Sequence, residues 1–337
     1  MKKFLLFVLL LTVIGAGVAW WGYGVLNAPY RGFSEPEVFV EIPQGAGVSG
    51  IASRLAAAGV VSNALAFRVA ARLSGDERKL QAGEYRFAEA ARPGEIVARL
   101  ARGDVYARLV TFREGLTMFE MADVFAASGI GTAAEFLSQA RDASRIKDLD
   151  PRASSLEGYL FPDTYKMPRT IGAKGTVDAM VAGFLREFDA DLRAAAAARG
   201  LSVHEAVTIA SIVEKETGQA QERPLVSAVY HNRLRIDMPL QCDPTVIYAL
   251  QLARRWNGNL TREHLQLNSP YNTYRFPGLP PGPIASPGRA SIEAAVRPAD
   301  APYLYFVSKN DGTHVFASTL AEHNRNVQQW QVKYFKK

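Results

Sequence analysis

Two glutamates, Glu214 and Glu216, are the residues of this sequence best suited to acid–base chemistry. They close a run in which apolar residues from Ala206 to Val213 recur at helical spacing, so one face of the helix should be buried. Gly218 then provides a helix stop. A carboxyl group at the end of a mostly apolar helix is costly to ionise, so its pKa should be raised, as a general acid at neutral pH requires. The alternative is that both glutamates are solvated residues at the end of an ordinary helix.

The spacing of these two glutamates places their side chains on different sides of the helix. Residues two positions apart on a helix point about 200° away from each other, so both carboxyl groups cannot face one pocket. The apolar stripe lies nearly midway between them, so periodicity alone does not choose the acid.

Composition argues against several other classes of protein. The chain has 337 residues, of which 48% are hydrophobic and 21% charged, which is ordinary for folded protein with room for two domains beside an anchor. The net charge of +6 suits an anionic membrane or an acidic polymer, but no dense basic run interleaved with aromatic residues predicts nucleic-acid binding. Cys242 is the single cysteine, so no internal disulfide forms. No metal site is predicted, because His204-Glu205 is followed by Thr208 where an HExxH motif needs histidine.

The first thirty residues predict a membrane anchor. The segment Phe4–Tyr30 contains no charged residue, and about 20 apolar residues are enough to cross a bilayer as a helix. Trp20, Trp21 and Tyr23 suit the aromatic belt at the membrane surface. A cleaved signal peptide is the alternative, but its apolar region would be shorter, and the bulky Trp pair argues for retention.

The flanking charges predict the orientation of this anchor. Lys2 and Lys3 place the N-terminus in the cytoplasm by the positive-inside rule. We therefore expect residues 1–30 to form the cytoplasmic N-terminus and a single-pass helix in the inner membrane, with the rest of the chain in the periplasm.

Residues 31–103 predict a small subdomain of β-α-α-β order, followed by a short helix. The predicted elements are a strand at Val38–Ile42, a helix from Val48 to about Gly59, a helix at Asn63–Leu73, a strand at Gly83–Phe87 and a helix at Glu95–Leu100. This order resembles a LysM-like module, a small fold that holds peptidoglycan glycan chains, and a purely structural spacer is the alternative.

Residues 104–337 predict a larger domain of mixed α+β type. Its first landmark, Ser155–Tyr165, gathers aromatic residues, two carboxylates and turn formers, as the walls of sugar-binding clefts do. A packed loop with solvated acids is the alternative. The helical and strand segments expected around it are a strand region at Tyr106–Phe112, a helix at Met118–Ala127, a long Ala-rich helical stretch at Ala173–Arg199 and a helix with a polar end at Val226–Leu234.

The last hundred residues predict a rigid loop and a closing hairpin. Asp243 before Pro244 predicts a helix start, and the Pro- and Gly-rich run Gly278–Ile284 predicts a rigid loop of the kind that lines binding clefts. The chain should close with a hairpin of strands Tyr303–Val307 and His314–Phe316 and with a C-terminal helix that contains His323. Both histidines are expected to be structural, because nothing in the sequence pairs them with a nucleophile.

Several motifs occur in a fixed order along the chain, namely Ala210–Thr217, Leu240–Tyr248, Tyr271–Tyr274 and Gly278–Ile284, with extensions at Leu156–Tyr165 and Pro302–Val307. Together they resemble the YceG-like family, the endolytic murein transglycosylases called MltG, and the resemblance covers the whole chain, anchor included. Cys242 departs from the family pattern, where Thr or another small polar residue is expected, and we expect it to alter the cleft slightly without touching the acid.

The resemblance also chooses the acid. Lytic transglycosylases carry one essential Glu followed by Ser or Thr, which matches Glu216-Thr217 and leaves Glu214 as the secondary candidate. It implies that Glu216 cleaves the bond between N-acetylmuramic acid and N-acetylglucosamine in peptidoglycan and leaves a 1,6-anhydro end, without metal or organic cofactor. The residues expected to position the sugar are Gln241, Asp243, Asn272, Tyr274, Glu157 and Tyr159.

The family's proposed task is to cut nascent glycan strands near the membrane and so to end their synthesis. Glycan-polymerising synthases would then be partners, although the sequence shows no docking motif for them. Two alternatives remain. A non-catalytic peptidoglycan-binding scaffold would not depend on Glu216, and a hydrolytic muramidase would need a second carboxylate, for which Asp243 or Glu157 is available.

Overall fold

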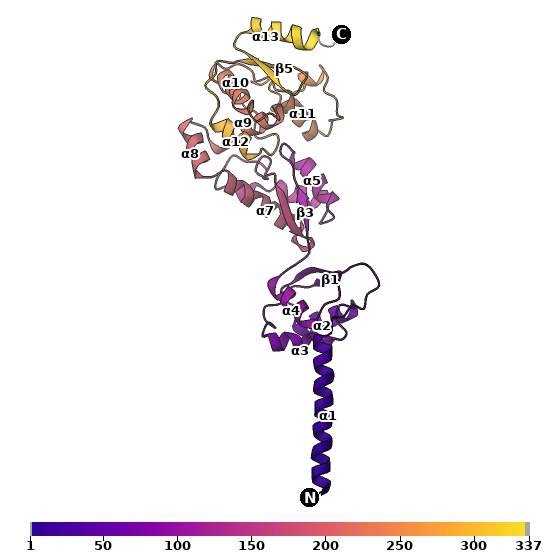
Figure 1. Cartoon of the computed structure of the whole chain (residues 1–337). Helices are drawn as coiled ribbons and strands as arrows, with labels where there is room; N and C mark the ends of the chain where they lie inside the picture. The colour runs from indigo at the N-terminus through magenta and orange to yellow at the C-terminus, as the bar shows by residue number, and fades with distance from the viewer. Residues whose placement is uncertain (1, 334–337) are drawn as a thin grey trace. The chain divides into compact units, whose positions relative to one another are not determined.

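The protein has a mixed α+β fold that divides into two units, and the structure, a computed structural model, describes residues 2–333 (Figure 1). The first unit runs to Arg108 and includes the returning segment Lys166–Thr170. The second unit consists of Leu109–Tyr165 and the chain from Ile171 onward. The returning segment lies within the range predicted for the larger domain, yet it packs with the smaller one.

The first unit contains the strand–helix–helix–strand order that the sequence predicts. Its two strands pair antiparallel, with Val40 opposite Tyr85. Alternation places Val40 and Ile42 in the core at 5% and 2% exposure, while Glu41 between them is exposed. The elements are α1 (Lys2–Asn27), β1 (Val38–Ile42), α2 (Val48–Ala57), α3 (Ala64–Ser74), β2 (Gly83–Phe87) and α4 (Pro93–Arg102).

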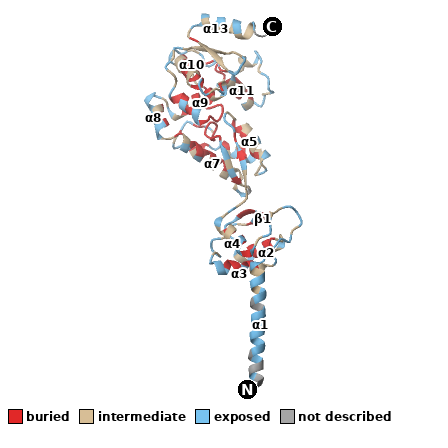
Figure 2. Cartoon of the chain, in the orientation of Figure 1, coloured by how far each residue is buried: buried red, intermediate tan, exposed pale blue. Residues whose placement is uncertain are grey.

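Helix α1 is the one helix in the described part of the chain that is long and apolar enough to cross a membrane. The qualifying span is Leu9–Asn27, and none of it is buried inside the protein. Figure 2 shows the contrast between the exposed α1 and the buried residues of the domains. The end of α1 joins the first unit directly, because Leu26 packs against the core of that unit.

Helix α9 (Val203–Glu216) forms the centre of the second unit. Every residue from Ala206 to Val213 is buried, and α10, α11 and α12 pack on this helix. The other elements of this unit are α5 (Met118–Ala127), α6 (Ala133–Ala140), η1 (Ala143–Ile146), α7 (Gly172–Glu187), α8 (Ala190–Ala198), α10 (Arg223–Arg235), α11 (Asp243–Leu252), η3 (His264–Gln266), α12 (Arg289–Val296), β5 (Tyr305–Ser308), β6 (His314–Ala317), α13 (Leu320–Val327) and η4 (Gln328–Val332).

Two further strands, β3 (Ala107–Thr111) and β4 (Thr164–Pro168), form a two-stranded sheet, and the short helix η2 (Arg169–Ile171) follows β4. Strands β5 and β6 form the closing hairpin predicted from the sequence, with Phe306 opposite Phe316. Helix α13 follows it, as expected.

The prediction of one long helical stretch at Ala173–Arg199 is wrong. The chain forms two helices, α7 and α8, because Phe188 and Asp189 leave the helical conformation between them. The Asp189 side chain accepts a hydrogen bond from the Leu192 N–H at 3.0 Å, so it starts a new helix as an N-cap. Helices α6 and α12 were not predicted, since each has only eight residues and so offers a short periodic pattern.

Gly158 allows two loops that are far apart in the sequence to approach each other closely. Its φ of +84° lies in the left-handed region, and a Cβ there would stand 2.5 Å from the Cβ of Pro283. The turn after Glu157 can therefore pack against the Pro-rich loop only with glycine at position 158.

The substitution Gly158→Ala tests this contact, with Gly200→Ala as its control. Gly200 has a similar φ of +73° but open space around it, so its alanine variant should lose only about 1 kcal/mol of unfolding free energy. Gly158→Ala should lose roughly 1–3 kcal/mol more, because it adds a steric clash to the same backbone strain. Urea unfolding of both variants measures the difference, and equal losses would show that the approach to Pro283 is not tight.

Candidate active site

Glu216 is the last residue of α9, and its carboxyl group faces a cavity. A capping box starts the helix: the Ser202 N–H donates to Glu205 at 2.9 Å, and the Glu205 N–H donates to the Ser202 hydroxyl at 3.3 Å. The buried middle of α9 fixes the helix, and Thr217 ends it in an extended conformation. The sequence therefore places a carboxyl group at the end of a rigid, buried element.

The cavity around Glu216 has a volume of about 260 Å³ and lies within the second unit. It combines a carboxylic acid, two tyrosines, an arginine and an amide, as sugar-binding sites commonly do. Four of the residues predicted from the sequence meet here, namely Glu216, Gln241, Asp243 and Tyr274. The other lining residues are Tyr230, Arg233, Leu240, Phe306 and His323.

Burial is the main cause that raises the pKa of Glu216. The negative charge of Asp243 raises this pKa further. Two hydrogen bonds oppose the rise: the Tyr230 hydroxyl donates to Glu216 Oε1 at 2.6 Å, and the Cys242 thiol also bonds to this carboxyl group. The raised pKa predicted for a carboxyl group at this helix end is therefore found at Glu216.

The expectation that Cys242 does not touch the acid is wrong. Its side chain is 1% exposed and hydrogen-bonds with both Glu216 and Tyr230. Burial raises the pKa of the thiol well above its ordinary value, so it stays protonated beside the acid. Sequence reasoning missed this contact, because the loop that carries Cys242 meets the end of α9 only in the folded chain.

Gln241 is held at the cavity in a strained backbone conformation. Its φ is +51°, in the left-handed region that residues other than glycine rarely adopt. The preceding residues are fixed by Arg233, whose Nη1 donates to the carbonyl groups of Pro239 at 3.2 Å and Leu240 at 2.9 Å. Arg233 Nε donates to the Leu304 carbonyl at 2.7 Å, which ties this loop to the segment before β5.

Tyr230 and Arg233 are site residues that the sequence analysis did not select. Both lie on α10, which was predicted only as a helix with a polar end. Their spacing of three residues places them on the same face of the helix, and this spacing is the signal that could have found them.

Asp243 and Tyr274 form a second polar pair in the cavity. The Tyr274 hydroxyl donates to Asp243 Oδ1 at 2.6 Å. Asn272, predicted to contact the sugar, is 0% exposed and does not line the cavity. Its amide donates to the carbonyl groups of Leu265 and Leu267, and its Oδ1 accepts from the Tyr274 N–H at 3.0 Å. Asn272 therefore shapes the loop that presents Tyr274.

The structure also places Glu157 and Tyr159 away from the cavity. Glu157 is 2% exposed, and its carboxyl group accepts hydrogen bonds from the Met118 N–H at the start of α5 and from the Tyr248 hydroxyl. Burial raises the pKa of Glu157 to about 8, against the lowering effect of these hydrogen bonds. The sugar contact predicted for Glu157 is replaced by a structural role.

Tyr159 belongs to a separate buried network. It is 0% exposed and hydrogen-bonds with Asp150, which also contacts His204 Nδ1 at 2.7 Å. His204 Nε2 lies 2.7 Å from the carbonyl oxygen of Pro281. The network thus joins Tyr159 to the Pro-rich loop, and the Tyr159 side chain is buried away from the cavity.

Glu214 points in a different direction from Glu216, as helical geometry requires. Its Oε2 accepts from the Gly288 N–H at 3.0 Å, and its Oε1 lies 3.6 Å from Arg223 Nη2. These contacts connect α9 to the start of α12 and to α10. Glu214 does not line the cavity.

The two histidines of the C-terminal region have different surroundings. His314 Nδ1 contacts Glu222 at 2.7 Å, and the same carboxylate accepts from Thr217, which follows the acid. His323, also expected to be structural, lines the cavity and stacks on Tyr305 at 5.1 Å, while burial lowers its pKa. Among residues 2–333, no group of three or more His, Cys, Asp or Glu side chains is arranged to hold a metal ion.

Comparison with known proteins extends the family resemblance from single motifs to most of the chain. The model of the YceG-like family matches residues 40–329. The chain belongs to this family. A Bacillus subtilis protein named endolytic murein transglycosylase is 32% identical over 333 residues, covering 93% of this chain and 89% of the relative. A Streptococcus pneumoniae protein of the same name is 30% identical, covering 95% of this chain but only 64% of the relative.

A solved structure supports the fold of this family member. The crystal structure of a YceG-like protein from Listeria monocytogenes matches with a TM-score of 0.59 and 34% sequence identity. The match covers 87% of this chain and 100% of that protein.

The pKa of Glu157 predicts a pH dependence of stability. Its folded-state pKa of about 8 lies above the ordinary value of 4.5, so its stabilising contribution is complete below pH 4.5 and is lost as the pH rises towards 8. Glu157→Gln should therefore flatten the fall in unfolding free energy between pH 5 and about 8. Chemical denaturation across this range measures the slope, with the exposed Glu77→Gln as control. An unchanged slope in Glu157→Gln would contradict the raised pKa.

Proposed function

We propose that this protein is a membrane-anchored endolytic transglycosylase of peptidoglycan, with Glu216 as its catalytic acid. The observation that carries the proposal is the single carboxyl group of raised pKa at the end of α9, which faces a polar cavity together with Tyr230, Gln241 and Asp243. Membership of the YceG-like family and the names of the bacterial relatives support the same substrate.

The proposed reaction needs one protein carboxyl group. Protonated Glu216 donates its proton to the glycosidic oxygen between N-acetylmuramic acid and N-acetylglucosamine, and the bond from this oxygen to C1 breaks. The C6 hydroxyl of the muramoyl residue then attacks C1, and the Glu216 carboxylate accepts the hydroxyl proton. The product carries a 1,6-anhydro bond. No protein nucleophile is required, because the attacking hydroxyl belongs to the same sugar.

The lining residues receive supporting roles in this proposal. Gln241, Asp243 and Tyr274 contact the sugar, and the carboxylate of Asp243 stabilises positive charge that develops at C1. Tyr230 and Cys242 hold the carboxyl group of Glu216. Asn272, Glu157 and Tyr159 act indirectly, since they fix the loops around the cavity.

We further propose a division of the chain into three parts. Residues 1–30 anchor the protein in the inner membrane with the N-terminus in the cytoplasm, and the apolar span Leu9–Asn27 supports this. Residues 31–103 form a LysM-like module that holds glycan strands, and residues 104–337 form the periplasmic catalytic domain. Tethering limits the enzyme to strands near the membrane, where glycan-polymerising synthases extend them, so cleavage would end elongation.

Mass spectrometry of fragments released from purified peptidoglycan tests the reaction and the acid together. The wild-type protein should release fragments with anhydro-muramoyl ends, and Glu216→Gln should slow this release about a hundredfold or more. Glu214→Gln is the matched control on the same helix and should retain the reaction. Activity in Glu216→Gln would reject this residue as the acid, and inactivity of the wild type would favour a binding scaffold.

Hydrolysis by a muramidase is the second candidate, because Asp243 shares the cavity with Glu216. Glu157, the other residue considered for this role, is buried elsewhere. Reducing ends in the same experiment would establish hydrolysis and reject the transglycosylase.

The hydrogen bonds to Glu216 predict a shift in the pH–rate profile. Because the Tyr230 hydroxyl lowers the pKa of the acid, Tyr230→Phe should raise that pKa and move the alkaline limb of kcat/KM to higher pH. Cys242→Ala should shift the limb in the same direction. Tyr165→Phe is the control, since it removes a hydroxyl that bonds the Phe161 carbonyl instead. A shift to lower pH would contradict the assigned hydrogen bonds.

A further inference from the structure

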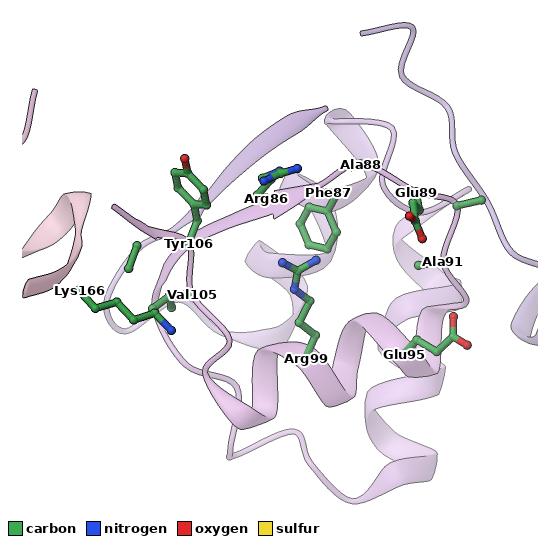
Figure 3. Close-up of a pocket in the computed structure, with 12 residues that line it drawn as sticks. Arg86, Phe87, Ala88, Glu89, Ala91, Glu95, Arg99, Val105, Tyr106 and Lys166 are labelled. Carbon is green, nitrogen blue, oxygen red and sulfur yellow. The ribbon is translucent and has the colours of Figure 1, made fainter. Parts of the chain in front are cut away.

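A second cavity, of about 540 Å³, lies entirely within the first unit. Figure 3 shows its walls: Arg99 lies against the ring of Phe87, Lys166 and Tyr106 lie on one side, and Glu89 and Glu95 lie on the other. The volume is in the range of about 300–1,000 Å³ that is typical of ligand sites. Lys166 and the two glutamates thus lie at opposite ends of the cavity, with Arg99 between them.

Some of these charges are already paired within the protein. Arg86 contacts Glu37 at 2.5 Å, and Glu95 accepts from the Arg92 N–H at 2.8 Å as part of a helix cap. Arg86 and Glu95 therefore already have partners within the protein.

Three charges of the cavity remain available to a ligand. Among the described residues, Arg99, Lys166 and Glu89 have no ion-pair partner. Arg99 is positioned by stacking, with its guanidinium carbon 5.1 Å from the centre of the Phe87 ring. The cavity therefore offers two cations and one carboxylate, and Arg99 lies between Lys166 and Glu89 (Figure 3).

This charge pattern fits a ligand with carboxylates and one ammonium group. Arg and Lys bind carboxylates through charge-assisted hydrogen bonds, and Glu89 would bind the ammonium. The alanine side chains and Val105 in the wall suit small methyl groups. A phosphate group fits less well, because the nearby Glu89 and Glu95 would repel it.

We propose that this cavity binds the uncross-linked stem peptide of peptidoglycan. Such a peptide carries several carboxylates, alanine methyl groups and a free ammonium on its diamino acid. Cross-linking converts this ammonium to an amide and removes its charge. The site would therefore prefer newly made strands to mature wall. This inference rests on the proposed function, since it takes peptidoglycan as the substrate.

Binding of a stem tetrapeptide to the full-length protein in detergent micelles tests the proposal. The peptide is labelled at its N-terminus, which is an amide in peptidoglycan, and fluorescence anisotropy gives the Kd. A second peptide, acetylated on the side-chain ammonium of the diamino acid, mimics the cross-linked state. Acetylation should weaken binding about fivefold to tenfold, through the loss of one charged contact.

Variants of the two cations locate the site. Arg99→Gln with Lys166→Gln should weaken binding of the free peptide about tenfold or more, and Lys166→Gln alone about threefold to tenfold. Arg102→Gln is the matched control, because it removes a charge from the same helix outside the cavity and should leave Kd unchanged. Thermal melting checks that the variants fold, and Lys166 is exposed, so its single variant should be folded in any case.

The outcomes separate this inference from the proposed function. Equal affinity for free and acetylated peptides, equal affinity of wild type and double variant, or tighter binding of pyrophosphate than of peptide would each overturn it. If Glu216→Gln loses cleavage while no peptide binds, this inference fails and the catalytic proposal stands. If the peptide binds as expected but wild-type protein releases no fragments, the catalytic proposal fails and the peptide-binding inference stands.

Discussion

The candidate site depends on a carboxyl group that ends a buried helix. Helix α9 is enclosed by α10, α11 and α12, and its last residue, Glu216, is half-buried at the cavity. Removal from water disfavours its charged form, and the carbonyl groups at a helix C-terminus disfavour a negative charge as well. Tyr230 and Cys242 oppose these effects by hydrogen bonding. The balance gives an acid that holds its proton more strongly than an exposed glutamate.

Hydrogen bonds from buried polar side chains hold the loops around Glu216 in position. Glu222 joins Thr217, directly after Glu216, to His314 on β6. Arg233 holds the loop that carries the strained Gln241, and Asn272 presents Tyr274. Each of these side chains satisfies backbone groups that would otherwise be buried without a partner, and such groups are costly to leave unpaired. The cavity therefore owes its shape to hydrogen bonds between these side chains and the backbone.

The two units carry different kinds of chemistry. The first unit combines the apolar helix α1 with a cavity whose free charges suit a zwitterionic ligand. The second unit contains the acid and a polar cavity.

The sequence by itself determined many of the helices and strands and the acid–base character of the helix end at Glu216. Alternation predicted β1 and β2, helical spacing predicted α5 and α9, and the order of motifs identified the family, because these signals are local along the chain. Tertiary structure alone decided which motif residues meet. Glu157, Tyr159 and Asn272 stand in the family motifs, yet they are buried outside the cavity. Arg233 and His323 lie outside those motifs and line the cavity, and the Cys242 thiol bonds the acid. Burial and contact depend on how distant segments pack, and periodicity contains no information about the partner across the cavity.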